Sequence, residues 1–479
     1  MDIVLISFLT NTVFVLALGW YLITNLQWYD YKIERVVLKH HKWWWHGLYF
    51  ILPFFVYFVS GQFFALFLLF FYLPSLIYWH FNLDKRLVLT WRVKRFFILL
   101  TGLTLFLNFL CLMRGGCATF GVFMPLALAY IVSLGIEKFL FATYRKVAAK
   151  KLASMPSLQI VAVTGSYGKT SIKNFIAQIL SVRYRVYATP RSVNTIGGII
   201  RDVNESLPED AEVYVCEAGA RQIGDIYTIS QFLNPQIVVV GAVGPQHLEY
   251  FKTVENIKRA KLEIMHSNRL KHALVHSSVT DEVHEKVQFF GDGITNVNGT
   301  LEGLDFDLSL NDKTVHFHTN LLGNFNTINL NAAVLVALSL GLSEEEIVKG
   351  VASLASVEHR LQRIDAGGKI ILDDGYNGNI DGMLEGVRLC ALHKGRKVIV
   401  TPGLVESTEA LNLRLIEAIN KVFDLVIVTG ALNSELFEKH LKVKKVILLK
   451  DKTTLTGTLG KKTHSGDIIL FANDAPNFI

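Results

Sequence analysis

The chain has 479 residues, and this length predicts two to four domains. Of its residues 51% are hydrophobic and 19% are charged, and its formal net charge is +7. Its four cysteines show no paired ligand spacing, which argues against a disulfide framework and against a zinc site. Many basic residues flank apolar segments, so the positive charge indicates a membrane surface and not a nucleic acid.

The hydrophobic excess is concentrated near the N-terminus, and we predict that residues 1–150 form an α-helical transmembrane region of about five helices. A tight turn is expected at Ser60-Gly61-Gln62, and no buried charge pair is expected inside the spans. The second span is short for the roughly 20 residues of a bilayer crossing, so a re-entrant segment or part of a kinked helix is the alternative there. The expected spans are residues 3–25, 47–60, 62–81, 96–112 and 117–140.

The loop charges predict the orientation of these spans, because loops rich in Lys and Arg stay in the cytoplasm. Basic clusters follow the first, third and fifth spans, whereas the opposite loops carry little beyond Arg114. The N-terminus is therefore expected outside and the C-terminal part in the cytoplasm. The clusters are Lys32, Arg35, Lys39 and Lys42; Lys85, Arg86, Arg92, Lys94 and Arg95; and Arg145, Lys146, Lys150 and Lys151.

From residue 151 onward, apolar strand-like runs alternate with helical patterns, which predicts α/β domains with mostly parallel sheets. We expect a central domain at 151–355 and a smaller, Rossmann-like domain at 356–479. Residues 289–320 read as a polar, turn-rich stretch, and residues 329–340 as a helix. The expected strands are Gln159–Val163, Val213–Cys216, Ile237–Val240, Lys369–Leu372, Lys397–Val400, Asp424–Val428, Val446–Leu449 and Asp467–Phe471.

The most informative segment reads Val-Thr-Gly-Ser-Tyr-Gly-Lys-Thr-Ser, from Val163 to Ser171, directly after the first of these strands. Glycines in such a turn let backbone N–H groups face phosphate oxygens, a lysine reaches the β- and γ-phosphates, and the next hydroxyl binds Mg²⁺. Gly168, Lys169 and Thr170 fit this pattern, although Val163 stands where the usual P-loop string has glycine. The segment predicts an ATP site in the central domain; an ordinary strand-turn-helix is the alternative.

Three further residues follow the predicted strands or lie near them. Glu217 ends its strand close to the predicted phosphate loop, which suits a Mg²⁺ ligand better than a solvated strand-end charge. His247 follows Gly-Pro-Gln in a loop, and by itself it reads as a loop or core histidine more than as a ligand. Lys261, in the helical run Arg-Ala-Lys-Leu-Glu, reads by spacing alone as a solvated lysine.

The order of these motifs resembles that of the Mur ligase family, the ATP-dependent amide-forming enzymes of peptidoglycan synthesis. The resemblance covers roughly residues 155–479, and it is specific because many motifs occur in one order. They are Thr-Gly-Ser-Tyr-Gly-Lys-Thr-Ser (164–171), Ser-Val-Asn-Thr-Ile-Gly-Gly (192–198), Glu-Ala-Gly-Ala (217–220), His247, Ala-Lys-Leu-Glu (260–263), Gly-Asn-Phe-Asn-Thr-Ile-Asn (323–329), His359-Arg360 and Asp-Asp-Gly-Tyr-Asn-Gly-Asn (373–379).

The resemblance implies roles for matching residues, including carbamylation of Lys261, whose new carboxylate would support a second Mg²⁺ ion. Catalysis would involve Lys169, Lys261 and His247. ATP would contact Gly165, Ser166, Gly168, Lys169, Thr170, Ser171, Asn326, Arg360 and Asp374. The implied Mg²⁺ ligands are Thr170, Glu217 and His247, and the implied substrate contacts are Asn194, Thr195, Tyr376 and Asn377.

The resemblance also implies a reaction: D-alanyl-D-alanine is added to a UDP-N-acetylmuramoyl-tripeptide through an acyl phosphate, at the bacterial inner membrane. Other cell-wall enzymes are conceivable partners. Members of this type carry a uridine-binding N-terminal domain, which this chain replaces with membrane spans. Either Asn194 and Thr195 suffice for the acceptor, or the acceptor is lipid-linked. Another membrane-anchored amide ligase of the same type, such as a poly-γ-glutamate synthetase, is the alternative.

Overall fold

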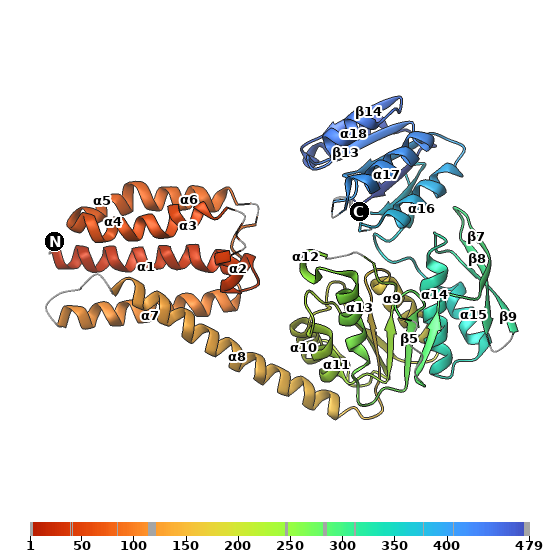
Figure 1. Cartoon of the computed structure of the whole chain (residues 1–479), viewed down its shortest axis with the longest axis horizontal. Helices are drawn as coiled ribbons and strands as arrows, with labels where there is room; N and C mark the ends of the chain where they lie inside the picture. The colour runs from red at the N-terminus through yellow and green to blue at the C-terminus, as the bar shows by residue number, and fades with distance from the viewer. Residues whose placement is uncertain are drawn as a thin grey trace. The chain divides into compact units, whose positions relative to one another are not determined.

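The computed structural model describes residues 3–38, 40, 42–83, 85–113, 121–244, 248–280, 285–310, 313–376, 378–405 and 407–473. The chain forms two compact units, Met1–Arg145 and Lys146–Ile479 (Figure 1). The first unit contains only helices and turns among its described residues, and the second contains three β-sheets.

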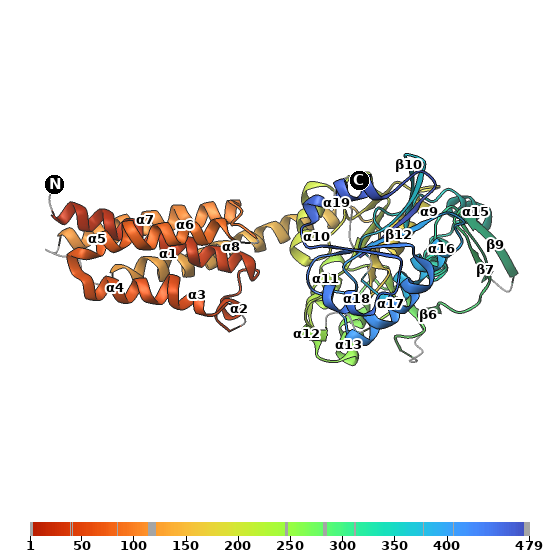
Figure 2. The same ribbon diagram turned by 90° about the horizontal axis from the view of Figure 1, so that it is seen from above.

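The first unit is a bundle whose interior is formed by large apolar side chains. Phe14, Val15 and Leu18 of α1 are at most 1% exposed, and Phe96 and Leu100 of α7 pack in the same cluster. Figure 2 shows α1, α6 and α7 running alongside one another. The helices are α1 (Ile3–Trp28), α2 (Ile33–Leu38), α3 (Trp44–His46), α4 (Leu52–Ser60), α5 (Phe64–Phe67), α6 (Leu73–Phe81), α7 (Trp91–Met113) and α8 (Phe123–Ala153), which continues into the second unit.

Prolines shape the two helical runs of this bundle between residues 44 and 81. The π-helical stretches Gly47–Ile51 and Leu68–Tyr72 end just before Pro53 and Pro74. Proline has no N–H and its ring collides with the carbonyl four residues earlier, and a wider turn relieves that collision. The predicted turn between the two runs is confirmed at Gly61, which has φ 53°.

Four helical runs among the described residues are long and apolar enough to cross a membrane. These runs coincide with four of the five predicted spans, and the remaining span, 47–60, lies in the shorter apolar run Trp44–Ser60. The four runs are Leu5–Trp28, Phe64–Phe81, Trp91–Met113 and Phe123–Ala153.

Close packing and polar contacts join the long helices. A side chain at Gly19 of α1 would place its Cβ 2.3 Å from Leu100 of α7, so glycine permits this approach. Arg95 and Glu137 form an ion pair of 2.7 Å, with side chains 38% and 18% exposed. Arg95 lies just outside the predicted span 96–112, so this pair is not one that the expectation for the spans excluded.

The second unit contains a parallel six-stranded sheet, as predicted for the central domain. The strand order is β2-β3-β1-β4-β5-β6, so β1 lies between β3 and β4 and all carboxyl ends share one edge. The strands are β1 (Gln159–Thr164), β2 (Val186–Ala188), β3 (Val213–Glu217), β4 (Ile237–Val240), β5 (His272–His276) and β6 (Val287–Phe290). The helices are α9 (Lys169–Leu180), α10 (Ile196–Glu205), α11 (Asp225–Leu233), α12 (Leu248–Phe251), α13 (Val254–Leu262), α14 (Asn326–Ser339) and α15 (Glu344–Ala352).

Residues 289–320 correct the prediction of a turn-rich stretch, because they contain an antiparallel sheet of β7 (Ile294–Gly299), β8 (Leu304–Leu310) and β9 (Lys313–Thr319). Along β8, buried Leu304, Phe306 and Leu308 alternate with more exposed polar residues. The polar and charged residues of the outer face give the segment a composition like that of a loop. The alternation of apolar and polar residues with a period of two is the pattern that indicates strands.

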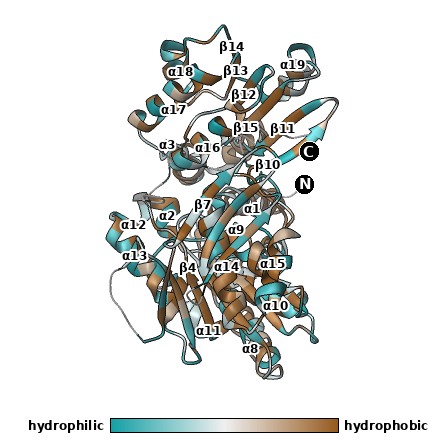
Figure 3. Cartoon of the chain, turned by 90° about the vertical axis from the view of Figure 1, so that its right-hand side faces the viewer, coloured by the Kyte–Doolittle hydropathy of each residue, from teal (hydrophilic) through white to brown (hydrophobic). Residues whose placement is uncertain are grey.

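The last part of the chain forms a second six-stranded sheet, in the order β10-β11-β15-β12-β13-β14. All five strands predicted there are confirmed to within two residues, and the antiparallel strand β10 was missed. Figure 3 colours strands such as β4 and β12 largely brown, in agreement with their burial. The elements are β10 (Gln362–Ala366), β11 (Lys369–Asp374), α16 (Ile380–Ala391), β12 (Lys397–Thr401), α17 (Glu409–Val422), β13 (Leu425–Thr429), α18 (Ser434–His440), β14 (Lys445–Leu449), α19 (Leu455–Lys462) and β15 (Ile468–Ala472).

Phe306→Ala tests the three-stranded sheet. The Phe306 ring is fully buried and stacks on Phe317 at a centroid distance of 5.4 Å. Its removal should cost about 3–5 kcal/mol and lower the midpoint of urea unfolding of the second unit. Thr314→Ala, on the exposed side of β9, should change the unfolding free energy by less than about 0.5 kcal/mol. Equal midpoints for the two variants would contradict the assigned burial.

Candidate active site

A glycine-bearing turn joins β1 to α9 at the carboxyl edge of the central sheet. Gly168 has φ 75°, and a Cβ there would lie 2.5 Å from Oδ1 of Asn329. A Cβ on Gly165 would lie 3.1 Å from the backbone of Gly241. Val163, which departs from the usual motif, is a fully buried residue of β1 and lies before the turn. The departure therefore lengthens the strand and leaves the turn itself intact.

The N-terminus of α9 fits an anion. No side chain caps this helix at Gly168, so the N–H groups of its first turn remain available to an oxyanion. The Lys169 ammonium donates to the carbonyl oxygens of Gly165 and Ser166 at 2.9 and 3.0 Å. Burial lowers the pKa of Lys169, Arg360 acts in the same direction, and the carboxylate of Glu217 opposes them. A phosphate would supply the negative charge that this buried lysine lacks.

Glu217, at the end of β3, lies directly opposite the P-loop hydroxyl. Its carboxylate accepts hydrogen bonds from Thr170 Oγ1 at 2.9 Å and from Asn194 Nδ2 at 3.2 Å. A hydroxyl and a carboxylate are ligands that Mg²⁺ prefers, and the residues therefore fit this ion. In the described part of the chain no three His, Cys, Asp or Glu side chains cluster as a metal site.

Lys261 of α13 is not the solvated lysine that its spacing predicts, because only 4% of the residue is exposed. Burial is the main cause that lowers its pKa to about 7, and the nearby charge of Lys169 adds to the effect. Glu217, Asp225 and Glu263 act in the opposite direction. A large fraction of Lys261 is therefore a neutral, nucleophilic amine at physiological pH.

Arg360 brings a further, half-buried cation to the site from the start of the C-terminal sheet. Partial burial lowers its pKa, whereas the charges of Asp374 and Glu217 raise it. Its guanidinium donates to the carbonyl oxygen of Tyr376 at 2.5 Å. Lys169, Lys261 and Arg360 thus all interact electrostatically with Glu217. The convergence of these basic groups suits a polyanion such as a nucleotide phosphate.

The segment around Arg360 has an unusual backbone. His359 and Leu361 have φ values of 57° and 52°, which are rare for residues other than glycine. Two carboxylates at the end of β11 hold them: Asp373 pairs with His359 Nδ1 at 2.6 Å, and Asp374 accepts from the Leu361 N–H at 3.1 Å. The position of Arg360 is thereby fixed by its two neighbours.

Sequence reasoning missed Arg191, which lies in the loop after β2. Its guanidinium lies 4.0 Å from the centroid of the Tyr376 ring and pairs with Glu358 at 3.2 Å. The contacts connect the loop that carries Asn194 with the segment before Arg360. No motif or spacing in the sequence pointed to this arginine.

The other predicted site residues are distributed around this centre. Asn326 is buried; it donates to the Leu322 carbonyl in the segment before α14 and accepts from Asn329, the residue against Gly168. Thr195 caps α10 by accepting from the Gly198 N–H. Ser166 donates to the Gly244 carbonyl and Ser171 is buried in α9. His247 and Asn377 lie outside the described residues.

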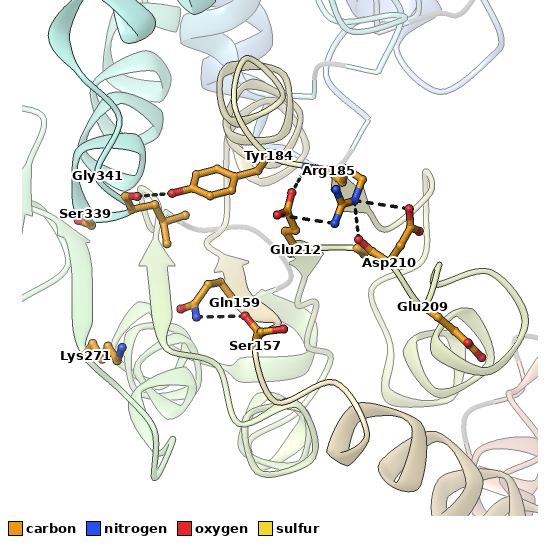
Figure 4. A pocket seen from close by; sticks show the side chains of 12 residues that line it. Ser157, Gln159, Tyr184, Arg185, Glu209, Asp210, Glu212, Lys271, Ser339 and Gly341 are labelled. Atoms are coloured by element: carbon orange, nitrogen blue, oxygen red, sulfur yellow. Dashed lines mark hydrogen bonds and ion pairs between the residues drawn. The ribbon is translucent and has the colours of Figure 1, made fainter.

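A pocket of about 720 Å³ lies at the opposite edge of the central sheet (Figure 4). Gln159, Glu212 and Lys271 line it, and each lies at or before the start of a strand. Arg185 in this pocket pairs with Asp210 and Glu212 at 3.5 and 3.7 Å. The phosphate loop lies at the other ends of these strands, so this pocket is separate from the candidate site.

Residues 163–337 match the Mur ligase middle domain. The chain is 29% identical over 336 residues to UDP-N-acetylmuramoyl-tripeptide--D-alanyl-D-alanine ligase of Bacillus subtilis, which covers 65% of this chain and 72% of that protein. It is 29% identical over 281 residues to the Escherichia coli ligase of the same name, covering 54% and 62%. The MurF ligase of Thermotoga maritima in complex with ADP superposes with a TM-score of 0.60 at 26% identity, covering 70% of this chain and 80% of that one. These matches support the predicted family.

The charges around Lys261 can be tested by substitution. Lys169→Met removes a neighbouring cation and should raise the pKa of Lys261 above about 7, whereas Glu217→Gln removes an opposing charge and should lower it. The pH dependence of acylation at Lys261, read by peptide mass spectrometry, measures the shift. Arg201→Gln, whose exposed guanidinium pairs with Glu205, serves as the control. Shifts of the same sign in both test variants would contradict the arrangement.

Proposed function

Because the chain belongs to the Mur ligase family, we propose that it is an ATP-dependent amide ligase that adds D-alanyl-D-alanine to a UDP-N-acetylmuramoyl-tripeptide in peptidoglycan synthesis. The observation that carries this proposal is the meeting of the phosphate loop, the Thr170–Glu217 pair and Lys261 at one sheet edge. The names of the Bacillus subtilis and Escherichia coli relatives state these two substrates.

The reaction has two steps, and the chain's residues have a role in each. The acceptor carboxylate attacks the γ-phosphoryl group of ATP and becomes an acyl phosphate, and ADP leaves. Lys169 and the first turn of α9 hold the phosphates and neutralise charge that builds up on them. Mg²⁺, held by Thr170 and Glu217, would add Lewis-acid stabilisation when bound. The dipeptide amine then attacks the acyl carbon, phosphate leaves, and the amide forms.

Lys261 is proposed to act as a carbamate. A neutral lysine amine attacks CO2, loses a proton, and gains a carboxylate that suits a second Mg²⁺ ion. The lowered pKa supports this step because it supplies the neutral amine near pH 7. The remaining assignments from the resemblance, including ligand roles for His247 and substrate contacts for Asn194, Thr195, Tyr376 and Asn377, belong to the same proposal.

We further propose that the first unit anchors the enzyme in the bacterial inner membrane, with its N-terminus outside and the domains 151–355 and 356–479 in the cytoplasm. Four long apolar helical runs, the shorter run Trp44–Ser60 as a fifth crossing, and the basic segments beside them support this placement. The acceptor is either the soluble nucleotide or a lipid-linked form. A product assay with D-Ala-D-Ala and each acceptor, and with glutamate in parallel, separates these cases from a poly-γ-glutamate synthetase.

Lys169→Ala should abolish ATP-dependent product formation by the full chain in detergent micelles, with a loss of at least about 100-fold in rate. The reason is that the buried ammonium faces the loop where the phosphates are expected. Arg201→Ala, on an exposed face of α10, should retain turnover. Undiminished product formation by the Lys169 variant would refute the phosphate role.

Lys261→Ala should lose activity because it removes the carboxylate that a carbamate would supply. Short carboxylic acids such as acetate should partly restore turnover in this variant and should leave the wild type unaffected. The same assay measures both effects. A Lys261 variant with wild-type rates would exclude the carbamate proposal while leaving the ligase assignment intact.

A further inference from the structure

The helical unit contains a groove of about 420 Å³ that is lined by residues of α1, α6 and α7. Ala17 and Leu76 form its floor and are 8% and 5% exposed. Ile77 and Phe81 form its rim and are 56% and 60% exposed. The groove is therefore open along the outer side of the bundle.

The groove is shaped for an apolar chain. Its walls are apolar apart from His80 and Thr101. It follows α6 from Leu73 to Phe81, a length of about 12 Å at the helical rise of 1.5 Å per residue. That is less than half of the roughly 30 Å hydrocarbon thickness of a bilayer, so the groove would hold part of one chain within a single leaflet.

Polar groups gather at one end of the groove. Trp20 Nε1 donates to His80 Nδ1 at 3.4 Å, so neutral His80 carries its proton on Nε2 and is itself a donor. The Arg86 guanidinium lies 5.3 Å from the centroid of the Phe81 ring and donates to the Phe81 carbonyl at 3.3 Å. Arg86 belongs to the basic segment 85–95, which the loop charges place in the cytoplasm.

We propose that this groove binds one lipid with a phosphate head group from the cytoplasmic leaflet, with its chain between α1, α6 and α7 and its head near Arg86 and His80. The occupant follows from charge complementarity: an apolar slot ending at a guanidinium fits an amphiphile with an anionic head. The inference rests on the membrane placement proposed above and is independent of the ligase chemistry.

The test uses the full chain in phosphatidylcholine nanodiscs and a diazirine-bearing dodecyl phosphate as the probe. Crosslinked peptides should map to α1, α6 and α7, and labelling should saturate. Dodecyl phosphate should compete, whereas dodecanol and inorganic phosphate, which lack the head or the chain, should not. Labelling that dodecanol suppresses equally would overturn the phosphate preference, and labelling spread over all helices would overturn the site.

Two variants sharpen the test. Arg86→Gln should raise the half-saturating probe concentration roughly fivefold, the effect of one basic residue beside an anionic head. Ala17→Phe fills the groove floor and should abolish saturable labelling. Lys138→Gln removes one exposed charge from α8 outside the groove and should leave labelling unchanged. Wild-type labelling of both test variants would refute the proposal. Extraction of the chain from membranes by alkaline carbonate would instead refute the membrane placement alone.

Discussion

The carboxylate of Glu217 is the contact on which the candidate site depends. It accepts from Thr170 and Asn194, and its charge opposes the burial of Lys169, Lys261 and Arg360. Buried cations are costly unless a negative group compensates them. Glu217 is the one acid that acts on all three cations, while Asp225 and Glu263 also act on Lys261 and Asp374 also acts on Arg360. The pKa of each cation is still lowered by burial, so a bound nucleotide phosphate would stabilise the charged forms.

Much of the architecture could be predicted from the sequence because its signals are local. Apolar runs bounded by turns revealed most of the parallel strands, although β2, β5 and β6 were not among those expected, and the glycine turn before Lys169 revealed the phosphate loop. The antiparallel strands β7–β9 were missed because their outward residues are charged or polar, and composition was given more weight than alternation. The buried state of Lys261 could not be read from spacing, because it depends on residues of other elements that fold around it. Arg191 was missed for the same reason: its partners Glu358 and Tyr376 are far away in the sequence.

The membrane-like unit shows a different limit of sequence reasoning. Hydropathy located its helical runs but gave no account of how they pack. The packing depends on single positions, such as Gly19 against Leu100, and on the ion pair between Arg95 and Glu137. The paired π-helical stretches before Pro53 and Pro74 allow two prolines to lie within helices without breaking them. Each of these features joins segments that a hydropathy plot treats separately.

The backbone on either side of Arg360 has a mechanical consequence. Left-handed conformations at His359 and Leu361 each store on the order of 1–3 kcal/mol, and Asp373 and Asp374 retain them. The connection between the two large sheets is therefore a strained backbone segment that two carboxylates hold in place, and not a flexible linker. Removing either carboxylate would remove a contact that holds this backbone, so the geometry of the connection depends on acid groups of the C-terminal sheet.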